Sequence, residues 1–171
     1  MQHIKICVYV SLLIVLAFFS ISCAVRESNL SPTNMVGDEQ LALNVLVQFL
    51  QNLHDEQYGQ ATQLYGGTYE HLLSYNQDIG AGDRAALLRN ACTFNGFQCL
   101  QIKSVKLDKK VSETEFSFRV EFLNADGTLF TLGPCCGSDE IDLSPQSEFY
   151  FTVVKTSKDS FVVMELPPYV P

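Results

Sequence analysis

A strictly alternating stretch in the second half of the chain constrains the fold more than any other feature. Between residues 115 and 122, every second side chain is apolar and those between them are polar or charged. Successive side chains of a β-strand point to opposite faces of a sheet, so the pattern predicts a strand with one buried and one solvated face. The predicted buried side chains are Phe116, Phe118, Val120 and Phe122.

Shorter alternations predict further strands on either side of this one. A slip at Lys103 and Ser104 indicates a β-bulge in the preceding strand. The Asp-Gly pair at 126–127 predicts a hairpin turn and a returning strand. Three prolines near the C-terminus predict the end of ladder pairing, because proline has no N–H group to donate. The further strands lie at 100–107, 130–132, 149–153 and 161–166, and the prolines are Pro167, Pro168 and Pro171.

The first half of the domain has the spacing of amphipathic helices. Apolar side chains recur every three or four residues over residues 41–53, after Asp38 as the predicted N-cap. A second helix covers residues 58–65, and a third follows a predicted cap at Asp83, with a further turn or two within residues 68–75. Helices followed by a run of strands predict an α+β fold. Its three N-terminal helices would pack on one face of an antiparallel sheet of four to five strands.

The N-terminal segment has the order of a secretory signal, with Lys5 before an apolar run over residues 6–19. It resembles the lipobox of bacterial lipoproteins, in which cleavage occurs before a cysteine that then carries lipid. The resemblance implies lipidation of Cys23, although Ser20 stands where those proteins usually have an aliphatic residue. Two other interpretations stay open: cleavage without an anchor, and an uncleaved membrane helix over residues 6–25.

Under all three interpretations, the remainder of the chain is exported. We therefore predict a signal peptide at residues 1–22, a lipid-anchored flexible tether at 23–37 and a single α+β domain at 38–171. The tether lacks apolar periodicity and contains Ser, Asn and Pro. The predicted location is extracytoplasmic, anchored to the bacterial cell membrane.

The charge of the chain narrows its range of partners. The net charge is −8, and removal of residues 1–22, which hold Lys5 and no acidic residue, makes it −9. An acidic domain argues against nucleic-acid binding, because phosphate contacts require Lys and Arg. It also argues against contact of the domain with anionic lipid, so the tether must keep the protein at the membrane. The predicted partners are the membrane through the N-terminal lipid and a small apolar ligand or a protein, with a homodimer as an open alternative.

Four cysteines within the domain predict disulfides, because an even number in an exported domain is typical of a disulfide framework. Three connectivities exist, and we favour a bridge from Cys135 or Cys136 to Cys92 or Cys99. One bridge with a vicinal or free pair stays open. A metal site has less support, because the spacing does not match that of known zinc sites.

The segment FLQNLHDEQYGQATQLYGG at residues 49–67, with the order of helices before strands, resembles the start of nuclear-transport-factor-2-like domains. The resemblance covers residues 38–168. It implies a cone, in which a strongly curved sheet wraps a long first helix and leaves a pocket at the open end. The superfamily includes isomerases, dehydratases, binding modules and association domains, so the resemblance implies no single function.

Enzymes of that superfamily generally keep an Asp, His or Tyr in the pocket for proton transfer. Here the predicted inward strand faces are apolar, so we predict no catalytic residue, and no motif predicts a metal or cofactor. A pocket mouth is predicted at Tyr65, Tyr69 and His71. The other polar candidates are interpreted as caps or solvated charge: His54, Asp55, Glu70, Asp139, Glu140 and Asp142.

These observations favour a non-catalytic, membrane-tethered binding or interaction domain with an aromatic-lined pocket or sheet face. One alternative is a small isomerase- or hydrolase-type enzyme that uses a His or Tyr on a helix. Another is a subunit of an envelope complex that dimerises through its sheet, which would require an exposed apolar sheet face.

Overall fold

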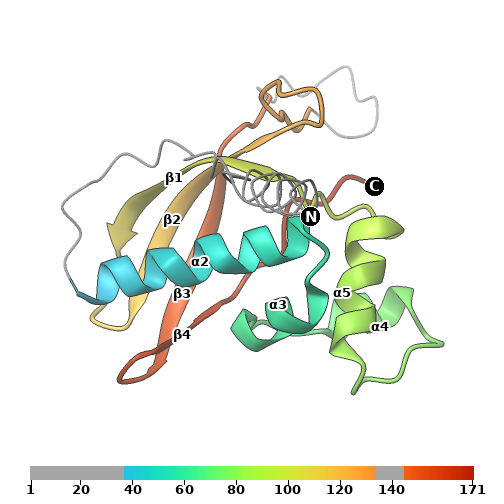
Figure 1. Cartoon of the computed structure of the whole chain (residues 1–171), viewed down its shortest axis with the longest axis horizontal. Coiled ribbons are helices and arrows are strands. Elements are labelled where there is room, and N and C mark those ends of the chain that lie inside the picture. Colours follow the sequence, from blue (N-terminus) through green and yellow to red (C-terminus); the bar gives the residue numbers. More distant parts are fainter. Residues whose placement is uncertain (1–36, 134–144) are drawn as a thin grey trace, which may run out of the picture.

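The structure is a computed structural model that describes residues 37–133 and 145–171, and these form four helices and a four-stranded antiparallel sheet. The strands lie in the order β1-β2-β3-β4 (Figure 1). The predicted α+β class is therefore confirmed. The elements are α2 Asp38–His54, α3 Tyr58–Leu64, α4 Glu70–Tyr75, α5 Arg84–Thr93, β1 Gln101–Lys110, β2 Glu115–Leu123, β3 Phe149–Ser157 and β4 Ser160–Val163.

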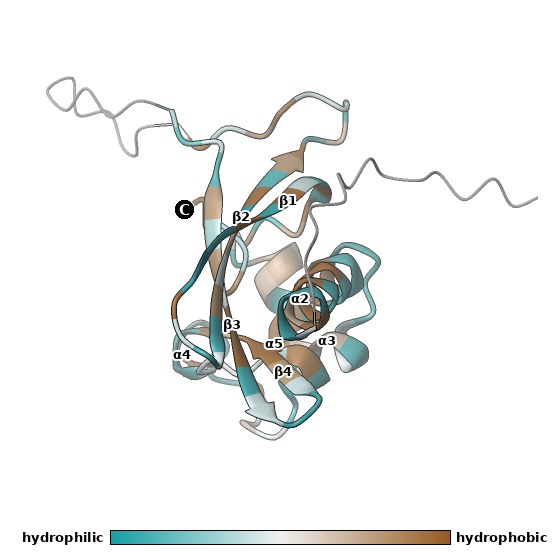
Figure 2. Cartoon of the chain, turned by 90° about the vertical axis from the view of Figure 1, so that its left-hand side faces the viewer, coloured by the Kyte–Doolittle hydropathy of each residue, from teal (hydrophilic) through white to brown (hydrophobic). Residues whose placement is uncertain are grey.

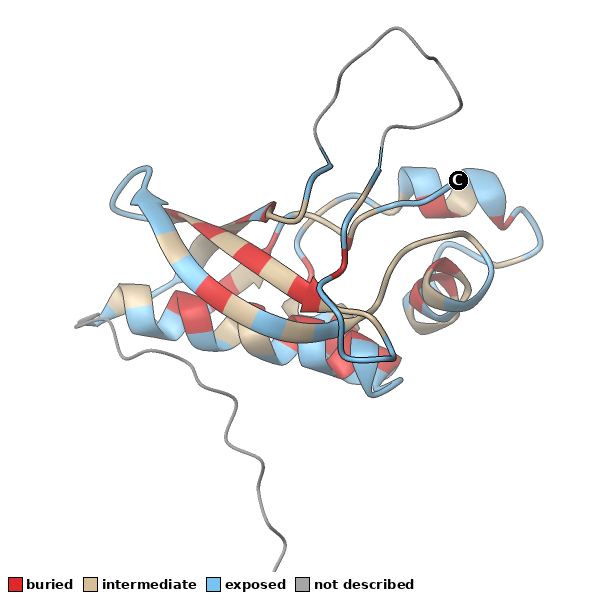
Figure 3. Cartoon of the chain, turned by 90° about the horizontal axis from the view of Figure 1, so that it is seen from above, coloured by how far each residue is buried: buried red, intermediate tan, exposed pale blue. Residues whose placement is uncertain are grey.

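Strand β2 lies inside the sheet and has the predicted alternation, with all four of its predicted inward side chains buried. Figure 3 shows buried residues alternating with less buried ones along the strands. Phe118 of β2 lies opposite Phe151 of β3, so aromatic rings from neighbouring strands share the inner face. Strand β1 carries the predicted bulge, as a register shift between Ile102 and Ser104.

Helix α2 lies across the sheet and supplies the other half of the core (Figure 1). Its buried face includes Leu46, Phe49 and Leu53, each of which is almost fully removed from solvent. Burial of a Leu or Phe side chain contributes about 1.5 to 3 kcal/mol, so this face holds the helix on the sheet. Figure 2 shows α2 beside strands along which hydrophobic and hydrophilic residues alternate.

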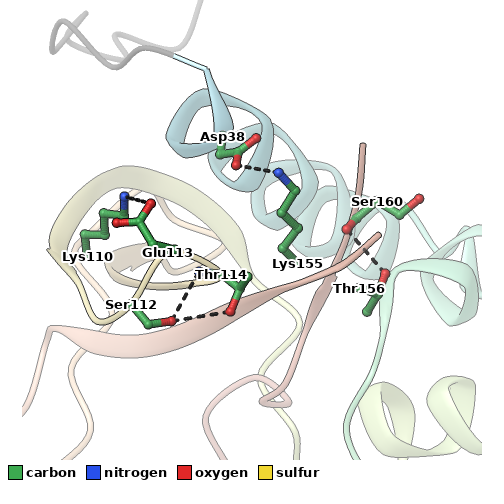
Figure 4. Close-up of polar contacts among 8 residues, drawn as sticks. All are labelled: Asp38, Lys110, Ser112, Glu113, Thr114, Lys155, Thr156 and Ser160. Carbon is green, nitrogen blue, oxygen red and sulfur yellow. Dashed lines mark hydrogen bonds and ion pairs between the residues drawn. The ribbon is translucent and has the colours of Figure 1, made fainter. Parts of the chain in front are cut away.

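The prediction that Asp38 caps α2 is wrong. Gly37 occupies the cap position without a side-chain hydrogen bond, and Asp38 is the first residue of the helix. Lys155 of β3 donates to the Asp38 carboxylate at 2.5 Å, which ties the start of α2 to the sheet (Figure 4). The carboxylate is thereby held in the first turn, where the helix dipole also favours negative charge.

The described residues contain four helices where the sequence predicts three. The additional helix is α4, which lies in the segment predicted to hold a further turn or two. The predicted cap of α5 is confirmed, because Asp83 Oδ1 accepts a hydrogen bond from Ala86 N at 3.1 Å.

The predicted returning strand at 130–132 does not form a ladder. The turn itself is present, with Gly127 N donating to Asn124 O at 2.9 Å. After the turn, isolated bridges join Leu123 to Leu129 and Leu132 to Gln146. Strand β3 pairs with β2 as far as Val120, so it occupies the edge that a returning strand would need.

Candidate functional site

The structure brings two of the three predicted pocket-mouth residues together. The Tyr65 ring is 8% exposed and stacks on Phe49 with 5.7 Å between ring centroids. Tyr69 meets Tyr65 edge-on, with 5.1 Å between centroids. His71, by contrast, is exposed on α4. The two tyrosines are therefore core contacts rather than parts of one cluster with the histidine.

The environment of these tyrosines favours the protonated phenol. Burial, with smaller contributions from Tyr69 and Glu165, raises the pKa of Tyr65 to about 12. Its hydroxyl donates to Thr68 O at 3.1 Å. Burial also raises the pKa of Tyr69, and the Arg84 guanidinium, 5.2 Å from the ring centroid, opposes that shift. A phenol that keeps its proton so firmly is a poor general base near neutral pH.

Two buried polar atoms lack a hydrogen-bond partner within the part of the chain that the structure describes. They are the Tyr69 hydroxyl and Asn52 Nδ2. Such groups are uncommon in folded proteins. They lie on different elements, Asn52 on α2 and Tyr69 at the start of α4.

The polar residues predicted as caps lie at helix ends. Asp55 is the C-cap of α2, and its backbone N donates to Gln51 O at 2.8 Å. His54 Nδ1 lies 3.2 Å from Cys99 O. Because a carbonyl oxygen can only accept, Nδ1 is the donor of this bond. His54 therefore joins the end of α2 to the segment before β1.

The favoured disulfide pairing is wrong, because Cys92 is bonded to Cys99, with 5.5 Å between their Cα atoms. Helix α5 ends at Thr93 and the chain turns back at once, which brings these two cysteines together. Cys23, Cys135, Cys136 and the acidic loop residues at 139–142 lie outside the described residues. Within residues 37–133 and 145–171, no group of His, Cys, Asp and Glu is arranged to hold a metal ion.

The structure reveals a groove of about 260 Å³ that the sequence does not predict. It lies between the end of α4, the end of α5 and the C-terminal segment. Several of its side chains are exposed, including Phe94 at 80% and Tyr75 at 52%. We call it the aromatic groove, and it is lined by Tyr75, Phe94, Asn95, Gly96, Tyr169, Val170 and Pro171.

Backbone pairing holds the C-terminal wall of the aromatic groove. Gln98 N donates to Pro168 O at 2.8 Å, and Val170 N donates to Gly96 O at 2.9 Å. These bonds flank an antiparallel bridge between Phe97 and Tyr169. This bridge is isolated and no strand follows β4 among the described residues, so the prediction that the prolines end ladder pairing is confirmed. The bond from Val170 is possible because this residue, which lies between prolines, keeps its N–H group.

Gly96 permits this close approach. Its φ is +83°, a value that side-chain-bearing residues rarely adopt, and a Cβ atom here would lie 2.2 Å from Val170 O. The Asn95–Gly96 pair between two cysteines is a turn signal in the sequence. That signal could have indicated the short bridged loop, although it does not reveal the groove.

None of the helices in the described ranges is long and apolar enough to cross a membrane. Comparison of the chain with models of protein families, with curated proteins and with solved structures found no match. The site is therefore interpreted from its own geometry.

Proposed function

We propose that this chain is an exported, membrane-tethered protein whose domain binds another molecule through the aromatic groove without catalysing a reaction. One observation carries the proposal. Among the described residues, nine large hydrophobic side chains are exposed, and four of them gather in this groove. Exposed apolar side chains that cluster in a concave surface mark interaction sites, whereas scattered ones need no explanation. The four are Tyr75, Phe94, Tyr169 and Val170.

The fold proposed for the domain is the nuclear-transport-factor-2-like cone. Support comes from the long helix α2 lying across an antiparallel sheet whose strands follow in chain order. The buried aromatic face of β2 and β3 fits the inner surface of such a cone. The cone hosts many functions, so the binding function is argued from the groove and not from the fold.

Both alternative functions have less support in the geometry. An enzyme that used Tyr65 would need a phenol that gives up its proton far more readily than burial allows here. A dimer through the sheet would need an apolar outer face. That face instead carries ion pairs, including Arg119 with Glu148 at 3.0 Å and Lys103 with Glu121 at 3.5 Å.

The proposed tether consists of residues 23–37, with lipid on Cys23 after cleavage of residues 1–22. A lipid anchor suits an acidic domain, because anionic headgroups would repel it. Labelling of cells with a radioactive fatty acid tests the anchor. The intact chain should take up label and fractionate with the membrane, whereas Cys23→Ser should do neither. Label on the Cys23→Ser variant would contradict this anchor.

Site-specific photo-crosslinking in intact cells tests the groove. A photoreactive phenylalanine analogue at position 94 should give a discrete adduct, and Tyr75→Ala should abolish it. The matched control is the same analogue at Val111, which is also exposed but lies at the β1–β2 hairpin. Equal adducts from both positions, or no adduct at position 94, would end the proposal.

A further inference from the structure

Three asparagine side chains form a hydrogen-bonded chain that ends at the aromatic groove. Asn76, at the end of α4, is 4% exposed and donates from Nδ2 to Leu72 O at 2.7 Å. The same Nδ2 donates to Asn95 Oδ1 at 2.9 Å. Asn90 of α5 donates from its own Nδ2 to Asn76 Oδ1 at 2.8 Å. Two of the three amides thus support the third, which lines the groove.

The chain of bonds fixes the orientation of all three amides. Leu72 O can only accept, so the Asn76 atom that faces it must be the NH₂ group. It follows that Asn76 Oδ1 accepts from Asn90 and that Asn95 presents its oxygen to Asn76. The Asn95 NH₂ group then remains, and no described residue accepts a hydrogen bond from it. Asn95 therefore offers a fixed donor to whatever fills the groove.

Two acceptors next to the Asn95 NH₂ group already accept hydrogen bonds within the protein. Gly96 O accepts from Val170 N at 2.9 Å and from Gln98 Nε2 at 2.8 Å, which occupies both of its lone pairs. Asn95 Oδ1 is bound to Asn76. Around Asn95, the groove therefore offers a ligand one hydrogen-bond donor, whereas Gly96 O and Asn95 Oδ1 are already occupied. Such an arrangement complements a ligand that is rich in acceptors and poor in donors.

The apolar part of the groove consists of aromatic rings without charge. The Tyr75 and Tyr169 rings are almost parallel, at 8°, with 6.4 Å between centroids. Phe94 projects beside them, and no charged side chain lines the groove. Its volume of about 260 Å³ lies below the range typical of pockets that enclose a whole small molecule, roughly 300 to 1,000 Å³. A short stretch of a longer chain would fit better.

We propose that the aromatic groove binds a proline-rich, extended segment of a partner protein, with Asn95 Nδ2 donating to a backbone carbonyl of that segment. Polyproline II segments have free carbonyls, and each proline removes one N–H donor while presenting an apolar ring face to aromatic side chains. A neutral sugar also offers apolar ring faces, but each of its hydroxyls is also a donor that needs an acceptor. This inference rests on the groove being the binding site of the proposed function.

Fluorescence anisotropy with a labelled, capped decaproline peptide tests the inference on the full chain in mild detergent. A glycine–serine peptide of equal length and the sugar chitohexaose serve as comparison probes. Asn95→Asp keeps the oxygen that accepts from Asn76 and removes the donor, so it should weaken decaproline binding about tenfold. Tyr75→Ala should weaken it at least as much. Thr93→Asp, at the exposed last residue of α5, is the matched control for added charge two residues from Asn95, and its affinity should stay within about twofold of the parent.

Thermal unfolding of each variant checks that the domain remains folded. Equal affinity for decaproline and the glycine–serine peptide would overturn the inference, as would equal effects of Asn95→Asp and Thr93→Asp. Binding of chitohexaose in place of decaproline, with loss on Tyr75→Ala, would overturn the peptide class but leave the groove as the site. Failure of both probes together with no crosslink from position 94 would end the proposed function as well.

Discussion

Two aromatic clusters of similar composition have opposite relations to solvent. One consists of Phe49, Tyr65 and Tyr69, and the other of Phe97, Tyr75 and Tyr169. Ring centroids lie 5.1 to 5.7 Å apart in the first and 5.4 to 6.4 Å apart in the second. Yet Tyr65 is 8% exposed and Tyr75 is 52% exposed. Ring–ring contact alone does not distinguish a core cluster from a binding surface.

The difference comes from what lies over each cluster. Tyr65 forms a parallel bridge with Val163, and Gly66 N donates to Val163 O at 2.9 Å, so strand β4 closes over the first cluster. In the second cluster, Phe97 lies within the loop closed by the Cys92–Cys99 disulfide and Tyr75 precedes the buried Asn76, yet Tyr75 and Tyr169 remain 52% and 42% exposed. The sheet buries the first set of rings, and the second set is held rigidly in an exposed position.

The largest expected effect is the loss of unfolding free energy when a tyrosine of the first cluster, rather than of the second, is replaced. Tyr65→Ala should lower the free energy of unfolding by about 3 to 5 kcal/mol, because it leaves a cavity in the core. Tyr75→Ala should lower it by less than about 1 kcal/mol, because that side chain is already half exposed. Urea unfolding followed by circular dichroism measures both. Similar losses would show that the two clusters are equivalent parts of the core.

A second pair of variants tests how closely the C-terminal wall fits the bridged loop. Gly96→Ala combines a positive φ with a clash against Val170 O and should cost about 3 kcal/mol. Gly127→Ala has almost the same φ, +82°, but open space around it, and should cost only about 1 to 2 kcal/mol. Thermal unfolding of both variants gives the comparison. Equal losses of stability in the two variants would contradict the close approach of Gly96 to Val170 O.

The disulfide should stabilise the groove more than the core cluster. Replacing both Cys92 and Cys99 with Ala opens a loop of about eight residues, and loop-closure entropy predicts a loss of about 2 to 3 kcal/mol. Hydrogen exchange should rise first at Asn95 and Val170 and only later at Gly66. Simultaneous loss of protection at all three would indicate a single cooperative unit instead of two separable regions.

The smallest effect is a dependence of stability on alkaline pH. The pKa of Tyr65 is raised to about 12 in the folded protein. Its contribution is therefore fully present below about pH 10 and is lost as pH rises towards 12, because the unfolded chain gives up the proton first. Tyr65→Phe should flatten the fall in urea midpoint over this range. If the urea midpoint of Tyr65→Phe fell with pH as steeply as that of the parent, the Tyr65 hydroxyl would have to be exposed to solvent.

Local periodicity was sufficient to predict much of the fold. The alternation at 115–122 predicts the buried face of β2, and the slip at Lys103 and Ser104 predicts the bulge of β1. These features depend on neighbouring residues sharing one face. The Asp38 cap and the strand at 130–132 were wrong because Lys155 and strand β3, both distant in sequence, compete for the same groups.

The aromatic groove could not be predicted in this way. Tyr75, Phe94 and Tyr169 come from three separate segments, and no periodic pattern joins them. Their meeting depends on the Cys92–Cys99 bridge and on a backbone bond to Gly96, neither of which the sequence specifies alone. The tyrosines that the sequence did single out, Tyr65 and Tyr69, flank the connection between α3 and α4 and pack in or against the core.

Hydroxyl-radical footprinting of the full chain, in intact cells and after purification, tests the central claim most directly. Tyr75 and Tyr150 are matched probes, because their exposed fractions are 52% and 53%, and Tyr150 lies on the sheet. If the groove is the binding surface, Tyr75 should be oxidised several-fold more slowly in cells than in the purified protein, with Tyr150 unchanged. Protection of Tyr150 alone, or equal oxidation of both residues in both settings, would contradict the account.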